Sequence, residues 1–230
     1  MIGLIGERGV GKTTLMLQRL KEHPEGGFYF SADNTLIAAE GLFTFVYHLY
    51  FDLQVSTVYI DEIHKYAHRT TEIKNIYDSM PTINVVFSGS SSLDLYKGVL
   101  DLARRASFWT IYPMSYKEYL KFFHQVEIPD FTVEEILQNH ERISSEYGHL
   151  HRQTWFQDFI NRGQYPYTKD IQSFSYVLKF QNLFDKVILE DIPVFVNLQT
   201  ASLDKLRRLL YFIANSTPSE LSFLSLSRKI

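Results

Sequence analysis

A glycine-rich stretch near the first residue restricts the fold more than any other feature of this chain. The pattern G-x-x-x-x-G-K-[ST] is met by Gly6, Glu7, Arg8, Gly9, Val10, Gly11, Lys12 and Thr13. An apolar run, Ile2–Ile5, precedes the pattern, and a helical pattern from Gly11 to about Lys21 follows it. Glycines let backbone N–H groups turn inward around a phosphate, and the start of a helix adds a positive end. The stretch therefore predicts a strand, a phosphate-binding loop and a helix, in that order.

These eight residues and the next one, Thr14, are the predicted phosphate site. We expect Lys12 to reach the β- and γ-phosphates of a nucleotide and the Thr13 hydroxyl to ligate Mg²⁺. Thr14 is placed to contact the α-phosphate. ATP and Mg²⁺ are the predicted cofactors.

An acidic pair follows another apolar run, in the sequence "VYIDEIHKY". Taken alone, Asp61 and Glu62 are typical of a solvated strand end. Together with the phosphate loop upstream, they indicate the arrangement called Walker B. Asp61 would then hold the Mg²⁺ shell, and Glu62 would be the base that polarises the attacking water.

Serines end the next apolar run, in "VVFSGSSSLDLYKG". Ser88 and Ser90 are candidates for contacting the γ-phosphate or the lytic water, the role called sensor 1. The alternative is structural, because Ser91 with Asp94 three residues later fits a helix cap.

An arginine pair in "LDLARRASFW" could supply a cation to the transition state, in its own chain or in a neighbouring subunit. The alternative for Arg104 and Arg105 is a solvated or salt-bridged pair.

Apolar runs alternate with helical patterns over the first half of the chain. The strand candidates are residues 2–5, 28–30, 56–60, 83–87 and 107–112. Continuous apolar strands separated by helices predict an α/β fold with a parallel sheet covered on both faces. After Pro113 the pattern is helical, and Thr132 with Glu135 three residues on fits a capping box.

Composition excludes several classes of site and partner. The chain has no cysteine, which excludes disulfides and thiolate metal sites. Its net charge of −3 gives no overall field that demands nucleic acid or an anionic membrane. No apolar run reaches the ~18 residues of a membrane helix, and no signal peptide is visible. We therefore expect a soluble, cytoplasmic protein without a membrane partner.

The motifs together resemble the AAA+-like P-loop ATPases of archaea and bacteria that usually carry a C-terminal DUF4143 domain. The resemblance rests on "GERGVGKTTL", "VYIDEIHK", "VVFSGSSS", "LARRASFWTIYPMSYKEYL" and "FINRGQYPY". It covers nearly the whole chain. In the last of these motifs, Gln164 stands where the family has the second glycine of a Gly-Gly-Phe/Tyr-Pro turn.

The resemblance implies ATP binding and hydrolysis, with Arg105 matching the family's arginine after the sensor strand. It implies a five-stranded sheet of order 5-1-4-3-2 in an α/β/α sandwich. The implied domains are an ATPase core at 1–114, a helical lid at 115–200, and the start of a winged helix at 201–230. The family normally has residues before the first strand that help to form the adenine pocket. We therefore expect a fragment of a longer protein, with phosphate recognition intact and base recognition weakened.

Three functions are compatible with these residues, and we expect the first, with the second as its alternative. The first is an ATP-hydrolysing switch or motor, with self-association or a protein client as its partner. The second is a nucleotide-binding signalling module that uses ATP as a conformational lock and hardly hydrolyses it. The third is a DNA-associated ATPase that binds DNA through the complete winged helix. Its support is a set of basic residues near the end of the chain, Lys205, Arg207, Arg208, Arg228 and Lys229; a solvated amphipathic face explains them equally well.

Overall fold

The computed structural model describes residues 1–90, 102, 104–150, 152–169, 171, 173–195, 200–217, 222 and 226. The predicted cap at Ser91 and Asp94 lies outside these residues, as do Arg228 and Lys229. The chain divides into two compact units, Met1–Gln172 and Ser173–Ile230. Each unit is described by itself.

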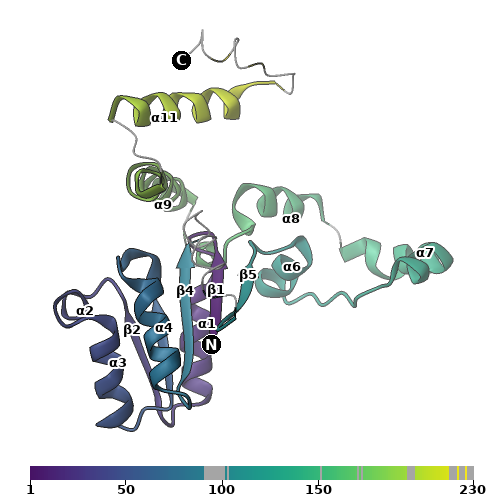
Figure 1. Ribbon diagram of the computed structural model, residues 1–230. Helices are drawn as coiled ribbons and strands as arrows, with labels where there is room; N and C mark the ends of the chain where they lie inside the picture. Colours follow the sequence, from purple (N-terminus) through teal and green to yellow (C-terminus); the bar gives the residue numbers. More distant parts are fainter. Residues whose placement is uncertain are drawn as a thin grey trace. The chain divides into compact units, whose positions relative to one another are not determined.

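A five-stranded parallel sheet forms the centre of the first unit (Figure 1). Its strands are β1 (Ile2–Gly6), β2 (Gly27–Ser31), β3 (Thr57–Asp61), β4 (Asn84–Ser90) and β5 (Ser107–Ile111). The spatial order is β2-β3-β4-β1-β5, with every neighbouring pair parallel. This order is the predicted 5-1-4-3-2 read from the other edge, so the predicted fold class is confirmed.

Seven helices of the first unit fall within the described residues. They are α1 (Lys12–Glu22), α2 (Thr35–Glu40), α3 (Leu42–Phe51), α4 (Arg69–Ser79), α6 (Tyr116–His124), α7 (Val133–Tyr147) and α8 (Gln153–Asp158). Shorter 3₁₀ turns lie at Ile63–Lys65, Gly148–Leu150 and Pro166–Thr168, and a π-helical turn lies at Phe159–Gly163. The helix predicted from Gly11 to about Lys21 is confirmed as α1.

The main core lies where β3 and β4 pack against α3 and α4. Alternate residues of the paired strands point to the same face, so Ile60 and Phe87 lie side by side in the register. Both belong to one buried apolar cluster together with Val46 of α3 and Ile76 of α4. Burial on this scale contributes roughly 1.5–3 kcal/mol for each large apolar side chain. The core fixes β3, and with it the position of the acidic pair that follows.

A glycine in β1 lets two aromatic rings meet across the sheet. The ring centroids of Phe87 in β4 and Phe108 in β5 lie 5.8 Å apart in an edge-on arrangement. A Cβ at Gly3, which is the register partner of both, would lie 2.6 Å from Phe108 and 2.9 Å from Phe87. Gly3 is thus required by packing.

Capping boxes begin α6 and α7, the first two helices after β5. The predicted box at Thr132 and Glu135 is confirmed at the start of α7. A second box begins α6. The Ser115 hydroxyl oxygen accepts a hydrogen bond from the Glu118 N–H, and the Glu118 carboxylate accepts one from the Ser115 N–H. α7 has no buried residue and is interrupted by non-helical dihedral angles at Asn139.

The second unit is helical in its described part. It contains α9 (Ser173–Lys186), a π-helical turn at Val187–Asp191, α10 (Ile192–Phe195) and α11 (Thr200–Asn215). Arg207 of α11 pairs with Asp185 of α9 at 2.7 Å. The predicted lid and winged-helix boundaries remain predictions. No helix in the described parts of either unit has the length and apolarity needed to cross a membrane.

The carboxyl ends of four strands converge at one edge of the sheet. Gly6, the last residue of β1, is the register partner of Ser90 at the end of β4. Asp61, the last residue of β3, is paired with Ser31 at the end of β2. In open parallel sheets, ligands bind at this edge.

Candidate functional site

The loop between β1 and α1 is a tight backbone turn that only glycine can adopt at key positions. Gly9 has φ of 86° and Gly11 has φ of 103°, both in the region that side chains disfavour. Gly11 also precedes the first residue of α1. A Cβ at Gly6 would lie 2.3 Å from the Ile111 carbonyl oxygen of β5. The sequence folds this way because glycine stands at each of these three positions.

Lys12 points back into this loop. Its Nζ donates to the Gly6 carbonyl oxygen at 2.8 Å and to the Glu7 carbonyl oxygen at 2.7 Å. The residue is buried, and burial lowers the pKa of its ammonium, although the carboxylates of Glu62 and Asp61 act in the opposite direction. The loop therefore encloses a positive charge whose hydrogen bonds, among the described residues, go to two backbone carbonyls.

Asp61 is the central acceptor of the site. The Thr13 hydroxyl donates to its Oδ2 at 2.6 Å, and the Tyr29 hydroxyl donates to the same oxygen at 2.9 Å. Its Oδ1 accepts from the Ser88 hydroxyl and, at 3.0 Å, from the Glu62 backbone N–H. Asp61 is only 4% exposed. One carboxylate thus connects the phosphate loop, β2 and β4.

Glu62 lies beside this cluster in a strained conformation. Its φ is 53°, a left-handed value that is uncommon for a residue with a side chain and is concentrated at functional sites. Its Oε2 is buried without a hydrogen bond among the described residues. Two basic side chains of the described residues lie within 4 Å of it: His64 Nε2 at 3.5 Å, which is charged only when protonated, and Lys65 Nζ at 3.9 Å.

A second ion pair holds Lys65 near the end of β2. Lys65 Nζ lies 2.9 Å from Asp33 Oδ2, and the Ser31 hydroxyl donates to Asp33 Oδ1 at 2.5 Å. The Ser31 hydrogen bond and then Lys65 lower the pKa of Asp33. The hydrogen bond from Lys65 to Asp33 in turn raises the pKa of Lys65.

The tyrosine-rich turn "QYPY" lies against the phosphate loop. The Tyr165 hydroxyl donates to Glu7 Oε2 at 2.9 Å, across 158 positions of sequence. A Cβ at Gly9 would lie 2.8 Å from Cε1 of Tyr167. The turn is anchored on the other side by the Met114 N–H, which donates to the Gln164 carbonyl at 2.8 Å.

Gln164, where the resembled family has a second glycine, fits this turn without strain. Its φ is −77° and its ψ is −13°, which any residue can adopt. The preceding glycine is required for a different reason: a Cβ at Gly163 would lie 2.5 Å from the Tyr119 ring.

The structure brings some of the predicted site residues together and leaves others apart. Lys12, Thr13, Asp61, Glu62 and Ser88 form one cluster. The remaining loop residues are near it by chain position: Gly6, Glu7, Arg8, Gly9, Val10 and Gly11 lead into α1, and Thr14 is exposed in its first turn. The Ser90 side chain lies outside the described residues.

Arg105 is not part of this cluster. Its guanidinium donates to both carboxylate oxygens of Asp78 in α4, at 3.1 and 3.0 Å, and lies over the Tyr77 ring. Arg105 precedes β5, so it lies at the amino end of a parallel strand, opposite the edge where Asp61 lies. The alternative of a salt-bridged arginine therefore describes its contacts in this structure.

Sequence reasoning missed Tyr29, Asp33, Lys65, Tyr165 and Tyr167. The signal for Tyr29 was present, because the expected sheet order already placed its strand beside the strand that ends in Asp61. No local pattern connects the turn at Tyr165 with Glu7.

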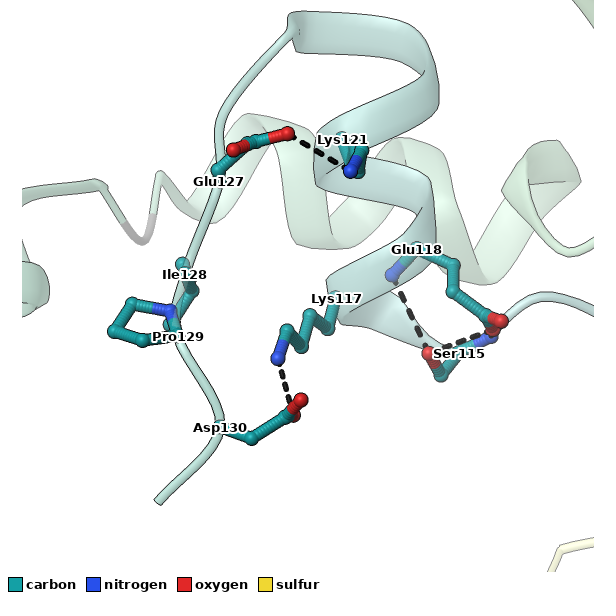
Figure 2. A pocket seen from close by; sticks show the side chains of 8 residues that line it. All are labelled: Ser115, Lys117, Glu118, Lys121, Glu127, Ile128, Pro129 and Asp130. Atoms are coloured by element: carbon teal, nitrogen blue, oxygen red, sulfur yellow. Dashed lines mark hydrogen bonds and ion pairs between the residues drawn. The ribbon is translucent and has the colours of Figure 1, made fainter.

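A separate cavity of about 630 Å³ lies along α6 (Figure 2). Two lysines line it, and both are neutralised by neighbouring carboxylates. Lys117 pairs with Asp130, and Lys121 Nζ lies 2.8 Å from Glu127 Oε1. A cavity with paired lysines of this kind is a poor phosphate site compared with the loop around Lys12.

Residues 1–120 match the model of a protein family described as an AAA domain. Uncharacterized protein MJ1637 of Methanocaldococcus jannaschii is 29% identical over 245 residues, an alignment covering all of this chain and 51% of that protein. The chain thus spans about half the length of this relative. A solved structure, the S. cerevisiae Hsp104-ADP complex, aligns with 93% of this chain and with 31% of the Hsp104 chain. The TM-score is 0.39 and the sequence identity is 16%.

Proposed function

The chain belongs to the AAA domain family, and on this premise we propose that it binds ATP with Mg²⁺ at the loop between β1 and α1 and hydrolyses it. The observation that carries the proposal is the cluster around Asp61. There the Thr13 hydroxyl and the Ser88 hydroxyl donate to one buried carboxylate, with Glu62 as the next residue. The residue that follows the phosphate loop, the end of β3 and a serine of β4 are therefore joined through Asp61. The phosphates of a nucleotide and its cation would be held together at this point.

The residues present fit a nucleotide phosphate and a hard divalent cation. Positive φ angles at Gly9 and Gly11 shape a backbone cradle that added side chains would strain. Lys12 supplies a buried ammonium beside that cradle. The Thr13 hydroxyl and the Asp61 carboxylate supply the oxygen donors that Mg²⁺ prefers.

Each residue has a distinct part in the proposed chemistry. Lys12 would exchange its two backbone carbonyls for phosphate oxygens, and Thr13 with Asp61 would hold the cation. Bound Mg²⁺ supplies positive charge that neutralises the phosphates. Glu62 would accept the proton of the attacking water, because its Oε2 makes no hydrogen bond to the described residues. Ser88 would fix the orientation of Asp61, and Ser90 would contact the γ-phosphate or the lytic water.

A conformational switch with little hydrolysis is the second candidate. It is favoured by the surroundings of Glu62 Oε2: His64 Nε2 lies 3.5 Å and Lys65 Nζ 3.9 Å from this oxygen, so an attacking water would have to compete with both groups for the carboxylate. The ion pair between Arg105 and Asp78 also favours the second candidate. This pair would have to open before the Arg105 guanidinium could reach a neighbouring subunit's site.

Two variants, each with a matched control, test both candidates. Lys12→Ala should weaken binding of a fluorescent ATP analogue by about tenfold or more, whereas Lys21→Ala, at the far end of α1, should not. Glu62→Gln should retain binding and slow single-turnover phosphate release by roughly 10²–10⁴-fold, with Glu22→Gln as its control. Phosphate release unaffected by Glu62→Gln would overturn the hydrolytic proposal. Tight binding with no release in the unmodified chain would establish the second candidate.

The partners proposed for the longer protein are a second copy or a protein client. DNA is the weaker proposal, since Arg207 is already paired with Asp185. Lys205 and Arg208 on α11 are the described residues that would remain for it.

A further inference from the structure

Every acceptor position of the Asp61 carboxylate is already taken by the protein. A carboxylate has two oxygens with about four lone-pair sites in total. In Asp61, Oδ2 accepts from the Thr13 and Tyr29 hydroxyls, and Oδ1 accepts from the Ser88 hydroxyl and the Glu62 backbone N–H. A residue that is to hold the hydration shell of a cation needs at least one of these sites free.

The four donors differ in how readily they can be withdrawn. The N–H of Glu62 belongs to the next residue of the backbone, and Ser88 is fully buried in β4. The Thr13 hydroxyl can ligate a cation through oxygen and still donate its proton to Asp61. Tyr29 differs from all three, because it is half-buried on β2, the edge strand of the sheet, and its O–H can rotate away.

We infer that Tyr29 is a positioning residue that sets the divalent-cation requirement of the nucleotide site. Its hydroxyl occupies Oδ2 of Asp61 until a bound cation's water displaces it, so the cation binds against a competing hydrogen bond. This inference rests on the proposed ATP and Mg²⁺ site and names its regulation. The position of Tyr29 follows from the register, in which Tyr29 pairs with Tyr59, two residues before Asp61.

The test is the Mg²⁺ dependence of nucleotide binding in Tyr29→Phe, which keeps the ring and removes the competing donor. A fluorescent ATP analogue is titrated at fixed free Mg²⁺ concentrations and in excess EDTA. The half-saturating Mg²⁺ concentration should fall about three- to tenfold, as expected for loss of one hydrogen bond to a charged acceptor. Affinity in EDTA should stay within about twofold of the unmodified chain. The EDTA value is measured on the same sample, so a partly unfolded variant does not imitate the result.

Tyr59→Phe is the matched control. It removes a hydroxyl from the register partner of Tyr29, and no hydrogen bond joins it to Asp61 among the described residues. Its half-saturating Mg²⁺ concentration should be unchanged. An unchanged value in Tyr29→Phe overturns the inference alone, and a raised value shows that Tyr29 aids cation binding, which also overturns it. If the unmodified chain shows no Mg²⁺-dependent nucleotide binding, the proposed function fails and the inference fails with it.

Discussion

Replacing Gly9 by alanine tests whether the tyrosine-rich turn rests on the phosphate loop. The backbone of Gly9 has φ of 86°, where an L-residue is disfavoured by roughly 1–2 kcal/mol. The new Cβ would lie 2.8 Å from Cε1 and 3.0 Å from Cδ1 of Tyr167, so the ring must leave its rotamer at about 0.5–1.5 kcal/mol. Gly9→Ala should therefore destabilise the first unit by about 1.5–3.5 kcal/mol in total.

Urea unfolding followed by tryptophan fluorescence measures this effect. Both tryptophans of the chain, Trp109 and Trp155, lie in the first unit, so their emission reports on its unfolding. A double-mutant cycle with Tyr167→Ala separates the two contributions. Without the ring, Gly9→Ala should lose only the backbone part, and the interaction energy should be about 0.5–1.5 kcal/mol. The same loss in both backgrounds would refute the contact between the turn and the loop.

Two further predictions concern features away from the phosphate loop. Thr132→Ala removes the N-terminal cap of α7 and should destabilise that helix by about 1 kcal/mol, seen as about fivefold faster hydrogen exchange of its amides with little change in α1. The hydrogen bond from Ser31 is the largest of the effects that lower the pKa of Asp33 from its ordinary value of 3.8. The ionised carboxylate therefore stabilises the folded state fully above pH 3.8, and this stabilisation is lost as the pH falls through the lower pKa of the folded state. The urea midpoint of Asp33→Asn should accordingly be lower at neutral pH and fall less steeply below about pH 4; an acid limb identical to that of the unmodified chain would contradict this.

The strands and the phosphate loop could be predicted because their signals are local. Each strand is a short apolar run, and the glycines of the loop are needed for the φ angles of Gly9 and Gly11. The capping box at Thr132 and Glu135 was predictable for the same reason, since both partners lie within one turn.

The contacts around Asp61 depend on register and side-chain reach, which sequence patterns do not contain. Ser88 was expected to face a phosphate or a water, yet its hydroxyl donates to Asp61. In the sequence, Tyr29 is one aromatic residue of a short apolar strand. The sheet order that the resemblance implies places this strand beside β3, but it does not show that the Tyr29 hydroxyl reaches Asp61. Arg105 matched a family position, but its contacts depend on where α4 ends, because Asp78 in the last turn of that helix is its partner.

The hydrogen bond between Tyr165 and Glu7 has a consequence for the order in which the molecule assembles. It closes a loop of 158 residues, so it can form only after almost the whole first unit has been made. During synthesis from the amino terminus, β1, α1, β3 and β4 emerge well before the tyrosine-rich turn. The phosphate loop is therefore exposed in the nascent chain before the turn reaches it. A nucleotide that binds before the turn has docked would meet the loop without the Tyr165 contact.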